Sequence, residues 1–246
     1  MDSPISIACS MGIMAYNEEA NIGRMLAAVV SQQTSNVNLT EIVVVASGCT
    51  DCTESIVHDW ATRDQRIRLI MQPRREGKAS AINQFLPQAR EKIVAVCGGD
   101  LLPAANAIEG LVAPFADRAV GMTTGRPVPV KDPGTFMGFA AHLIWEPRHQ
   151  ISLRNFKVGE MVAFRKIFER IPSHTSVGEA SIEPVILGQG YEARYVPLEK
   201  IIAYAAQSGA DQFITETAEP RDCSARGGGF SGGRVAPAED LAGTRT

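Results

Sequence analysis

The sequence predicts an α/β fold in which a mostly parallel central sheet carries helices on both faces. Three observations lead to this prediction. Short apolar strands alternate with amphipathic helices over the first hundred residues, and such alternation builds βαβ units. The interior strands are apolar on both faces, which is typical of a parallel sheet covered by helices. The chain has 246 residues, of which 45% are hydrophobic, and this is enough for one large domain with its own core.

The first strand and helix open the chain. The segment 5–14 is rich in apolar residues and predicts a strand, which the polar loop 15–19 follows. Apolar residues then recur at the spacing of one helix face: Ile22, Met25, Leu26, Val29 and Val30. We expect Asn17 to cap this helix, with Glu18 and Glu19 favourably placed in its first turn.

Three further strands repeat this pattern and are expected at residues 41–45, 67–71 and 93–97. The helices between them carry apolar stripes, formed by Ile56, Val57 and Trp60 in one and by Ala81, Ile82, Phe85 and Leu86 in the other. Open α/β sheets bind ligands at the carboxyl ends of their strands. The loops expected to meet at that edge are 15–19, 47–51, 74–78 and 98–100.

Beyond Pro103 the pattern becomes less regular. The expected elements are a helix at 104–115, a Gly- and Pro-rich irregular stretch at 121–138, a strand at 158–164, a short helix at 179–187 and a strand at 191–196. The last segment, 219–246, contains many glycines and few large apolar residues, so it cannot bury enough surface to offset its ordering entropy. We expect a single domain at 1–218 and a flexible tail at 219–246.

Charge and hydropathy argue against several classes of function. The formal net charge is -3 and the basic residues form no long run, so nothing indicates a nucleic acid or an anionic membrane as a partner. The longest apolar runs fall far short of the roughly 18 residues that span a bilayer. The first residues lack the basic and apolar regions of a signal peptide. A cytoplasmic protein without a transmembrane segment is expected.

Five motifs occur in an order that resembles one known family. They are Ala15-Tyr16-Asn17-Glu18-Glu19, the segment 43–51 with Ser47-Gly48-Cys49-Thr50-Asp51 at its end, Gly77 to Asn83, Asp100-Leu101-Leu102-Pro103, and Gly159 to Arg165. Together, over roughly residues 5–205, they resemble the family 2 glycosyltransferases. The resemblance implies a GT-A fold, in which a Rossmann-like nucleotide-binding half, about 1–103 here, precedes a mixed acceptor half, about 104–218.

The resemblance also implies a chemistry. Family members use a nucleotide-diphosphate sugar and a divalent metal, Mg²⁺ or Mn²⁺, and usually transfer the sugar with inversion. A carboxylate deprotonates the acceptor hydroxyl as it attacks the anomeric carbon, while the metal neutralises charge on the departing diphosphate. Such an enzyme therefore needs two acidic sites.

The metal site of the family is an Asp-X-Asp motif, and the corresponding triplet here is Gly98-Gly99-Asp100. The first carboxylate is therefore absent. Asp100 remains as the candidate metal ligand and as a candidate catalytic residue, with diphosphate oxygens and water completing the coordination of the ion. The alternative is that Asp100 caps the helix that follows.

The second acidic site of the family is a pair of acids at the start of a helix that precedes Gly-Tyr. Here Gly178 and Glu179 occupy that place, and Gly190 opens the Gly-Tyr pair. The spacing to Gly190 makes Glu179 the candidate catalytic base, whereas an Asp-Glu order would place the lost catalytic acid at Gly178. Glu183, one turn further along the helix, is the reserve candidate. The alternative for Glu179 is a favourable contact with the helix dipole.

The resemblance places Ala15, Tyr16 and Glu18 at the nucleotide sugar. Ser47 stands where the family commonly has an Asp that accepts from the base, and its hydroxyl both donates and accepts, so UDP is not implied. Lys78 lies at a predicted helix start, where backbone N–H groups and an ammonium suit a diphosphate. The alternative for Lys78 is a solvated surface lysine.

Three residues are expected on the acceptor side, namely Trp145, His149 and Glu160. The Trp145 ring suits stacking on a sugar, although a place in the core is an equal alternative. A structural role is the more common outcome for a histidine such as His149.

The predicted function is that of a glycosyltransferase. The sugar would pass from a nucleotide-diphosphate donor to a small-molecule or natural-product hydroxyl or amine. A soluble acceptor is favoured over a polyprenyl lipid because the Arg-rich and membrane-anchoring continuation of many relatives is not evident. The alternative is a catalytically degenerate homologue that binds a nucleotide sugar as a partner or sensor protein. The sequence leaves the sugar, the base and the oligomeric state open.

Overall fold

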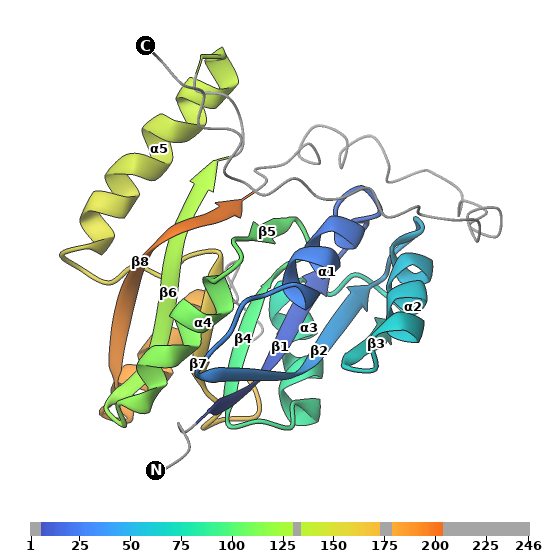
Figure 1. Ribbon diagram of the computed structural model, residues 1–246, viewed down its shortest axis with the longest axis horizontal. Coiled ribbons are helices and arrows are strands. Elements are labelled where there is room, and N and C mark those ends of the chain that lie inside the picture. Colours follow the sequence, from blue (N-terminus) through green and yellow to red (C-terminus); the bar gives the residue numbers. More distant parts are fainter. Residues whose placement is uncertain (1–5, 130–133, 173–178, 204–246) are drawn as a thin grey trace.

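Eight strands form one mixed sheet in the computed structural model of the chain, which describes residues 6–129, 134–172 and 179–203 (Figure 1). The strand order is β3-β2-β1-β4-β7-β6-β8-β5. The predicted tail at 219–246 and the end of the predicted acceptor half, 204–218, lie outside the described residues. Among the described residues, no helix has the length and apolar character needed to cross a membrane.

The first half of the chain forms the parallel part of the sheet. Its strands are β1 (Ile7–Ala15), β2 (Val37–Ser47), β3 (Ile67–Gln72) and β4 (Ile93–Gly98), and its helices are α1 (Ile22–Val30), α2 (Thr53–Arg63) and α3 (Lys78–Phe85). β1 pairs in parallel with both β2 and β4, and β2 pairs in parallel with β3. The predicted alternation of strands and helices is therefore confirmed, and it brings the carboxyl ends of these strands to one edge.

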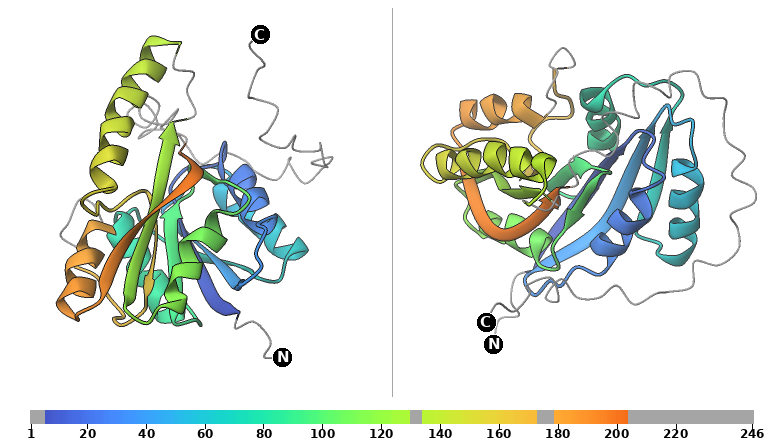
Figure 2. Two further views of the ribbon diagram at one scale, coloured as in Figure 1. Left: turned by 60° about the vertical axis from the view of Figure 1, so that its left-hand side comes forward. Right: turned by 90° about the horizontal axis from the view of Figure 1, so that it is seen from above.

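Helices cover both faces of the sheet, as predicted. One face packs against α1, α2 and α4 through a core cluster that includes Leu26, Val57 and Leu111. The other face packs against α3 and α6 through a second cluster that includes Phe85 and Ile186. Figure 2 shows the sheet between these layers. Burial of apolar side chains on both faces, at about 25 cal/mol per Å² of apolar surface, holds the strand ends rigidly in place.

The second half adds antiparallel neighbours. Its elements are β5 (Leu101–Pro103), α4 (Ala107–Val112), β6 (Val120–Pro129), α5 (Phe136–Ser152), β7 (Met161–Arg165), α6 (Ile182–Gly188) and β8 (Glu192–Ala203). β7 is antiparallel to both β4 and β6, and β5 is antiparallel to β8, whereas β6 and β8 run parallel. The mixed character predicted for this half is confirmed.

Two elements of this half were missed from the sequence. The stretch 121–138, predicted to be irregular, contains the long strand β6 and the start of α5. Gly121 in β6 is required for packing, because a Cβ at this position would lie 2.3 Å from Tyr191 Cβ. The helix α5 was not predicted at all, and Pro147 lies within it.

The predicted cap of the first helix was also wrong. Helix α1 begins at Ile22 with Asn21 in the N-cap position. Asn17 instead has a φ of 53°, in the left-handed region that asparagine tolerates better than most residues. The loop after β1 is therefore longer and more sharply turned than predicted, and this turn brings Glu18 to the edge of the sheet.

Candidate active site

A pocket of ≈ 250 Å³ lies at the carboxyl ends of β1, β2 and β4, beside the start of α3. We call it the strand-end pocket, and its lining residues are Met14, Ala15, Tyr16, Glu18, Ser47, Arg75, Gly77, Lys78, Ala81, Gly98 and Asp100. All six residues that the sequence assigned to the nucleotide sugar line this one pocket. The expected convergence of the four loops is thus confirmed in the geometry.

Hydrogen bonds between two loops fix the rim of the strand-end pocket. The Thr50 amide donates to Asn17 Oδ1 at 2.8 Å, and the Glu18 amide donates to Thr53 Oγ1 at 2.7 Å. The carboxylate of Asp51 accepts from the Thr53 amide at 3.0 Å, at the first residue of α2. The first two bonds hold the loop after β1 against the loop after β2 and the start of α2, and the third satisfies a backbone donor that α2 leaves unpaired at its start.

Arg75 stacks over the Tyr16 ring, with Cζ 4.0 Å from the ring centroid. This approach depends on Gly48, whose φ of +67° favours glycine, because a Cβ there would lie 2.4 Å from the Arg75 amide nitrogen. Ser47 is buried, and its hydroxyl donates a long 3.5 Å hydrogen bond to the Arg74 carbonyl. The side of the pocket formed by β2 and the loop after β3 is therefore polar and carries a cation.

Asp100 lies where β4 leads into β5. The Asp100 carboxylate fills the space that Gly98 leaves by lacking a side chain. A Cβ on Gly98 would lie only 2.5 Å from Asp100 Oδ1. Burial raises the pKa of Asp100, and the Glu179 carboxylate raises it further, against its own backbone amide and Lys78, which lower it. Asp100 does not cap a helix, since α4 begins only at Ala107, so the alternative considered from the sequence is excluded.

Glu18 is the second acid of the strand-end pocket and is 8% exposed. Burial raises its pKa to about 7, although a 2.8 Å hydrogen bond from Asn21 Nδ2 works against this change. The neighbouring carboxylates of Asp100 and Asp51 add to the rise. Near neutral pH, Glu18 therefore exchanges between a neutral acid and an anion.

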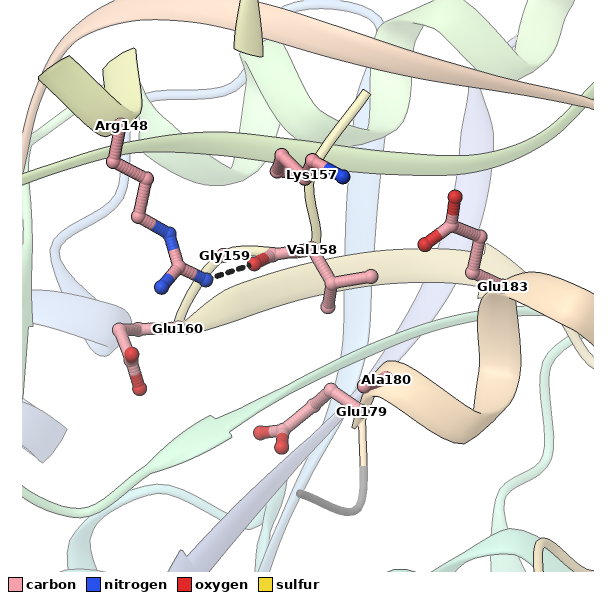
Figure 3. A pocket seen from close by; sticks show the side chains of 8 residues that line it. All are labelled: Arg148, Lys157, Val158, Gly159, Glu160, Glu179, Ala180 and Glu183. Carbon is pink, nitrogen blue, oxygen red and sulfur yellow. Dashed lines mark hydrogen bonds between the residues drawn. The ribbon is translucent and has the colours of Figure 1, made fainter. Parts of the chain in front are cut away.

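A second pocket of ≈ 220 Å³ lies next to the first (Figure 3). We call it the Glu179 pocket, and its lining residues are Arg148, Lys157, Val158, Gly159, Glu160, Glu179, Ala180 and Glu183. Glu179 is 4% exposed and opens the short 3₁₀ turn Glu179–Ser181 before α6. In Figure 3 the carboxylates of Glu160 and Glu179 lie on the same side of the pocket, whereas that of Glu183 lies apart from them. Both base candidates line this pocket, and Glu179 is the buried one of the two.

One ion pair joins the two pockets. Lys78, which lines the strand-end pocket, places Nζ against Oε1 of Glu179 in the second pocket. Burial alone lowers the pKa of Lys78, but the Glu179 carboxylate more than offsets this effect and raises it, with help from Glu160. Lys78 is therefore a charged ammonium. It is half-buried and paired, so the alternative of a freely solvated surface lysine is excluded.

Glu160 lies just before β7 and is held by a constrained turn. The Gly159 amide donates to Thr124 Oγ1 at 2.9 Å, and a Cβ on Gly159 would lie 2.6 Å from that oxygen. Burial raises the pKa of Glu160, and Lys78 opposes this rise. Of the three residues predicted for the acceptor side, Glu160 is the one that lines a pocket.

Trp145 and His149 line neither pocket. His149 Nδ1 lies 2.7 Å from the Tyr195 hydroxyl, so its ring fastens α5 to β8. The Trp145 ring lies beside the Arg148 guanidinium, with Cζ 5.3 Å from the ring centroid. Both residues are placed to orient α5 and Arg148, rather than to line the pocket themselves.

Two cations of the Glu179 pocket were given no role of their own from the sequence. Arg148 reaches from α5 and donates to the Val158 carbonyl at 2.6 Å, as Figure 3 shows. Lys157 is exposed at the rim of the same pocket. The sequence does contain a signal for Lys157, because it is a basic residue two positions before Gly159, at the edge of a recognised motif. Arg148 carried no such signal because α5 was not predicted.

The chain has the GT-A fold of glycosyltransferases, and this fold places the strand-end pocket next to a second, acid-lined pocket. The solved structures that resemble the chain agree with this class. A mannosyltransferase from Pyrobaculum calidifontis, in complex with GDP-Man and Mn²⁺, superposes with a TM-score of 0.63 at 24% identity and covers 83% of this chain and 59% of that chain. Glucosyl-3-phosphoglycerate synthase from Mycobacterium tuberculosis, with Mn²⁺ and UDP, gives 0.54 at 18% identity and covers 85% and 75%.

The chain belongs to glycosyl transferase family 2, whose family model matches residues 10–175. Among curated proteins, glycosyltransferase AglE of Haloferax volcanii is 29% identical over 116 residues, which are 47% of this chain and 38% of that protein. Dolichyl-phosphate beta-glucosyltransferase ALG5C of Trichomonas vaginalis is 31% identical over 103 residues, which are 40% and 31%. The matched part thus spans about a third of the length of these relatives.

Proposed function

We propose that the chain transfers a sugar from a nucleotide-diphosphate sugar to an acceptor, with inversion at the anomeric carbon. The strand-end pocket receives the nucleotide diphosphate, and the Glu179 pocket receives the acceptor. The observation that carries this proposal is the buried Glu179 carboxylate, which lies at the junction of the two pockets. A general base must lie within reach of the acceptor proton, and this junction is where donor and acceptor would meet.

The proposed reaction is a single displacement. The acceptor hydroxyl gives its proton to Glu179, and its oxygen attacks the anomeric carbon on the face opposite the diphosphate. The bond between that carbon and the diphosphate oxygen breaks, and its electron pair leaves with the nucleotide. Attack from the opposite face in one step inverts the configuration of the sugar.

The metal that the family resemblance implies does not fit these residues well. Gly98 replaces the first acid of the motif, and Asp100 fills the space beside it. Within the residues that the structure describes, no group of three His, Cys, Asp or Glu side chains is placed to hold an ion. The ammonium of Lys78 lies 4.0 Å from the Cβ position of residue 98. Its positive charge repels a metal ion bound at the same place. Asp100 is therefore a poor anchor for Mg²⁺ or Mn²⁺, and the proposed reaction does not rely on either ion.

For the acceptor we propose a small molecule that carries a hydroxyl, as the sequence predicts. The Glu179 pocket supports this choice because both carboxylates and cations line it, which suits a polyhydroxylated ligand. The cytoplasmic location predicted from the sequence stays a prediction, and so does the division into a domain at 1–218 and a tail.

One observation favours a second candidate acceptor, a lipid phosphate. Helix α5 exposes large apolar side chains on one stripe, with Phe136 82%, Leu143 60% and Ile144 67% exposed. Arg148 and Lys157 in the adjoining pocket suit a phosphate group. Two relatives carry names with such acceptors, a dolichyl-phosphate beta-glucosyltransferase and a dodecaprenyl-phosphate galacturonate synthase. A phosphate acceptor is already ionised at neutral pH and needs no general base, which separates the two candidates chemically.

The test has two stages. A thermal-shift panel of UDP-, GDP-, dTDP- and CDP-sugars identifies the donor, because a ligand of the folded state raises the melting temperature. The donor is then offered with hydroxylated small molecules, and separately with a polyprenyl phosphate in detergent, and product is followed by release of nucleoside diphosphate. NMR of the product reports the anomeric configuration. Retention of configuration contradicts the proposed displacement, and binding without transfer to either acceptor class supports the degenerate nucleotide-sugar-binding homologue instead.

A further inference from the structure

The strand-end pocket would have to balance the negative charge of a nucleoside diphosphate without the help of a metal ion. Its cations are Arg75 and Lys78, and its acids are Glu18 and Asp100. A diphosphate brings further negative charge, and the departing diphosphate must be stabilised as the bond to the sugar breaks. Because Gly98 removes an acid from the usual metal motif, a cation from the chain itself has to supply that balance.

Lys78 has the position that this role requires. It is the first residue of α3, directly after Gly77, so its side chain starts at a helix end where backbone amides face outward. Its Nζ lies 4.0 Å from the point where a Cβ of residue 98 would stand, so the ammonium is next to the position of the missing acid. Lysine is a compact point charge with three rotatable donors, and this suits a flexible diphosphate.

We propose, on the basis of the function proposed above, that the ammonium of Lys78 takes the place that the family gives to a metal ion and holds the donor diphosphate. Arg75, held over the Tyr16 ring, is the second cation of the pocket. Donor binding then depends on the chain's own charge and does not require a divalent ion.

The ion pair with Glu179 gives this arrangement a second consequence. Lys78 turns toward Glu179 at the junction of the pockets. A bound diphosphate competes for the same ammonium, and its movement toward the donor leaves the Glu179 oxygen free to accept the acceptor proton. Donor binding thereby prepares the base. An enzyme with this order of events does not expose an active base before the donor is in place.

A purely structural role for Lys78 gives a different result. In that case Lys78 would only neutralise the buried Glu179 carboxylate, and its removal would lower stability but leave donor affinity unchanged. The two roles are separated by measuring the Kd of the donor nucleotide as well as the melting temperature of each variant.

The experiment is isothermal titration of the full chain with whichever UDP-, GDP-, dTDP- or CDP-sugar raises the melting temperature most in the thermal-shift panel, once in EDTA and once in Mn²⁺. We expect the wild type to bind equally well in both buffers. Lys78→Met should weaken binding by about 10- to 100-fold, which corresponds to the loss of hydrogen bonds to a charged partner. Lys78→Arg should restore most of the affinity because it keeps the cation. Lys92→Met, an exposed lysine just before β4, is the matched control and should bind as the wild type does.

Two results overturn the inference and leave the proposed function standing. One is a wild type that binds the donor only when Mn²⁺ is present. The other is a folded Lys78→Met variant whose Kd equals that of the wild type. A wild type that is folded but binds no nucleotide sugar in either buffer overturns the proposed function itself.

Discussion

The ammonium of Lys78 and the carboxylate of Glu179 form an ion pair across the junction of two pockets. Lys78 opens α3, and Glu179 lies directly before α6. Both helices pack into the same core cluster on one face of the sheet, so their first residues are held at a fixed separation. The pair therefore joins the pocket that we propose for the nucleotide to the pocket that we propose for the acceptor.

Replacement of Glu179 by glutamine tests the assignment of the base. The glutamine side chain would keep the shape of the glutamate but could not take a proton, so transfer to a hydroxyl acceptor should fall by about 10²- to 10⁴-fold. Donor affinity should be retained or improved, since Lys78 loses its competing partner. Initial rates of nucleotide release and titration with the donor measure the two effects. Glu169→Gln is the matched control, because Glu169 is exposed and lines neither pocket, and transfer at the wild-type rate by Glu179→Gln contradicts the assignment.

Replacement of Asp100 by asparagine separates the metal and lysine explanations of donor binding. A metal ligand at Asp100 would make this variant lose its Mn²⁺-dependent binding. If Lys78 is the resident cation, Asp100 instead repels the diphosphate, and Asp100→Asn should bind the nucleotide as tightly as the wild type or several-fold more tightly, as expected for one screened charge near a protein surface. Titrations in EDTA and in Mn²⁺ distinguish the two explanations. A loss of affinity confined to the Mn²⁺ buffer would mean that Asp100 binds the metal ion.

The pKa of Glu18 predicts how stability changes with pH. Its ordinary value is 4.5, and burial raises it to about 7 in the folded chain. Between these values the folded state keeps a proton that the unfolded chain has released, so the contribution of Glu18 is present below pH 4.5 and is lost as pH rises through 7. Glu18→Gln should therefore be more stable than the wild type at pH 8, by at most about 3 kcal/mol. Urea unfolding at pH 5 and pH 8 measures this. Glu169→Gln, at an exposed site, should show no such pH-dependent gain.

Glu41 has the opposite behaviour at the other end of the strands. It accepts hydrogen bonds of 2.7 Å from Ser10 Oγ and 2.7 Å from Arg68 Nη2. Burial raises its pKa, but the Arg90 amide, Ser10 and Arg68 outweigh burial and lower it overall. Its stabilising effect is therefore present above pH 4.5 and is lost as pH falls. Glu41→Gln should lower the free energy of unfolding at pH 7 by about 3 kcal/mol.

The Glu41→Gln variant is also a control for the active-site variants. The network lies away from both pockets, so donor affinity should stay at the wild-type value once the protein is folded. Urea unfolding at pH 7 and titration with the donor measure the two quantities. A change in donor Kd would mean that loss of stability alone weakens binding, and this would weaken every conclusion drawn from the affinity of destabilised variants.

The parallel half of the fold could be predicted because its signals are local. Strands such as 41–45 and 93–97 are apolar on both faces, and this pattern has few other interpretations. The loops after them then had to meet at one edge. That reasoning correctly brought Ser47, Lys78 and Asp100 into a single pocket.

The rest depended on contacts that sequence patterns do not contain. Gly121 indicates irregular backbone by itself, yet in β6 it makes room for Tyr191, which is distant along the chain. Helix α5 exposes much of its apolar surface and contains Pro147, and both features hide its helical period. The pairing of Lys78 with Glu179 joins two halves of the fold, so neither motif alone predicts it.

The last prediction concerns Gly48, which sets the position of Arg75. An alanine there would be strained at φ +67°, and its Cβ would lie 2.4 Å from the Arg75 amide nitrogen and 2.7 Å from the Arg74 carbonyl carbon. These are backbone atoms and cannot rotate away, so the loop after β3 must move. Gly48→Ala should lower the free energy of unfolding by about 1 to 3 kcal/mol and should also weaken donor binding, because Arg75 leaves its place over Tyr16.

Gly190→Ala is the matched control for this variant. Its φ of +81° imposes similar backbone strain, but a Cβ there meets nothing within 4 Å, and the residue lines neither pocket. It should lower stability by about 1 kcal/mol and leave the donor Kd unchanged. Urea unfolding and donor titration of both variants separate strain from displacement. If Gly48→Ala binds the donor as well as Gly190→Ala does, the position of Arg75 is not important for the nucleotide, and Lys78 alone must balance the diphosphate.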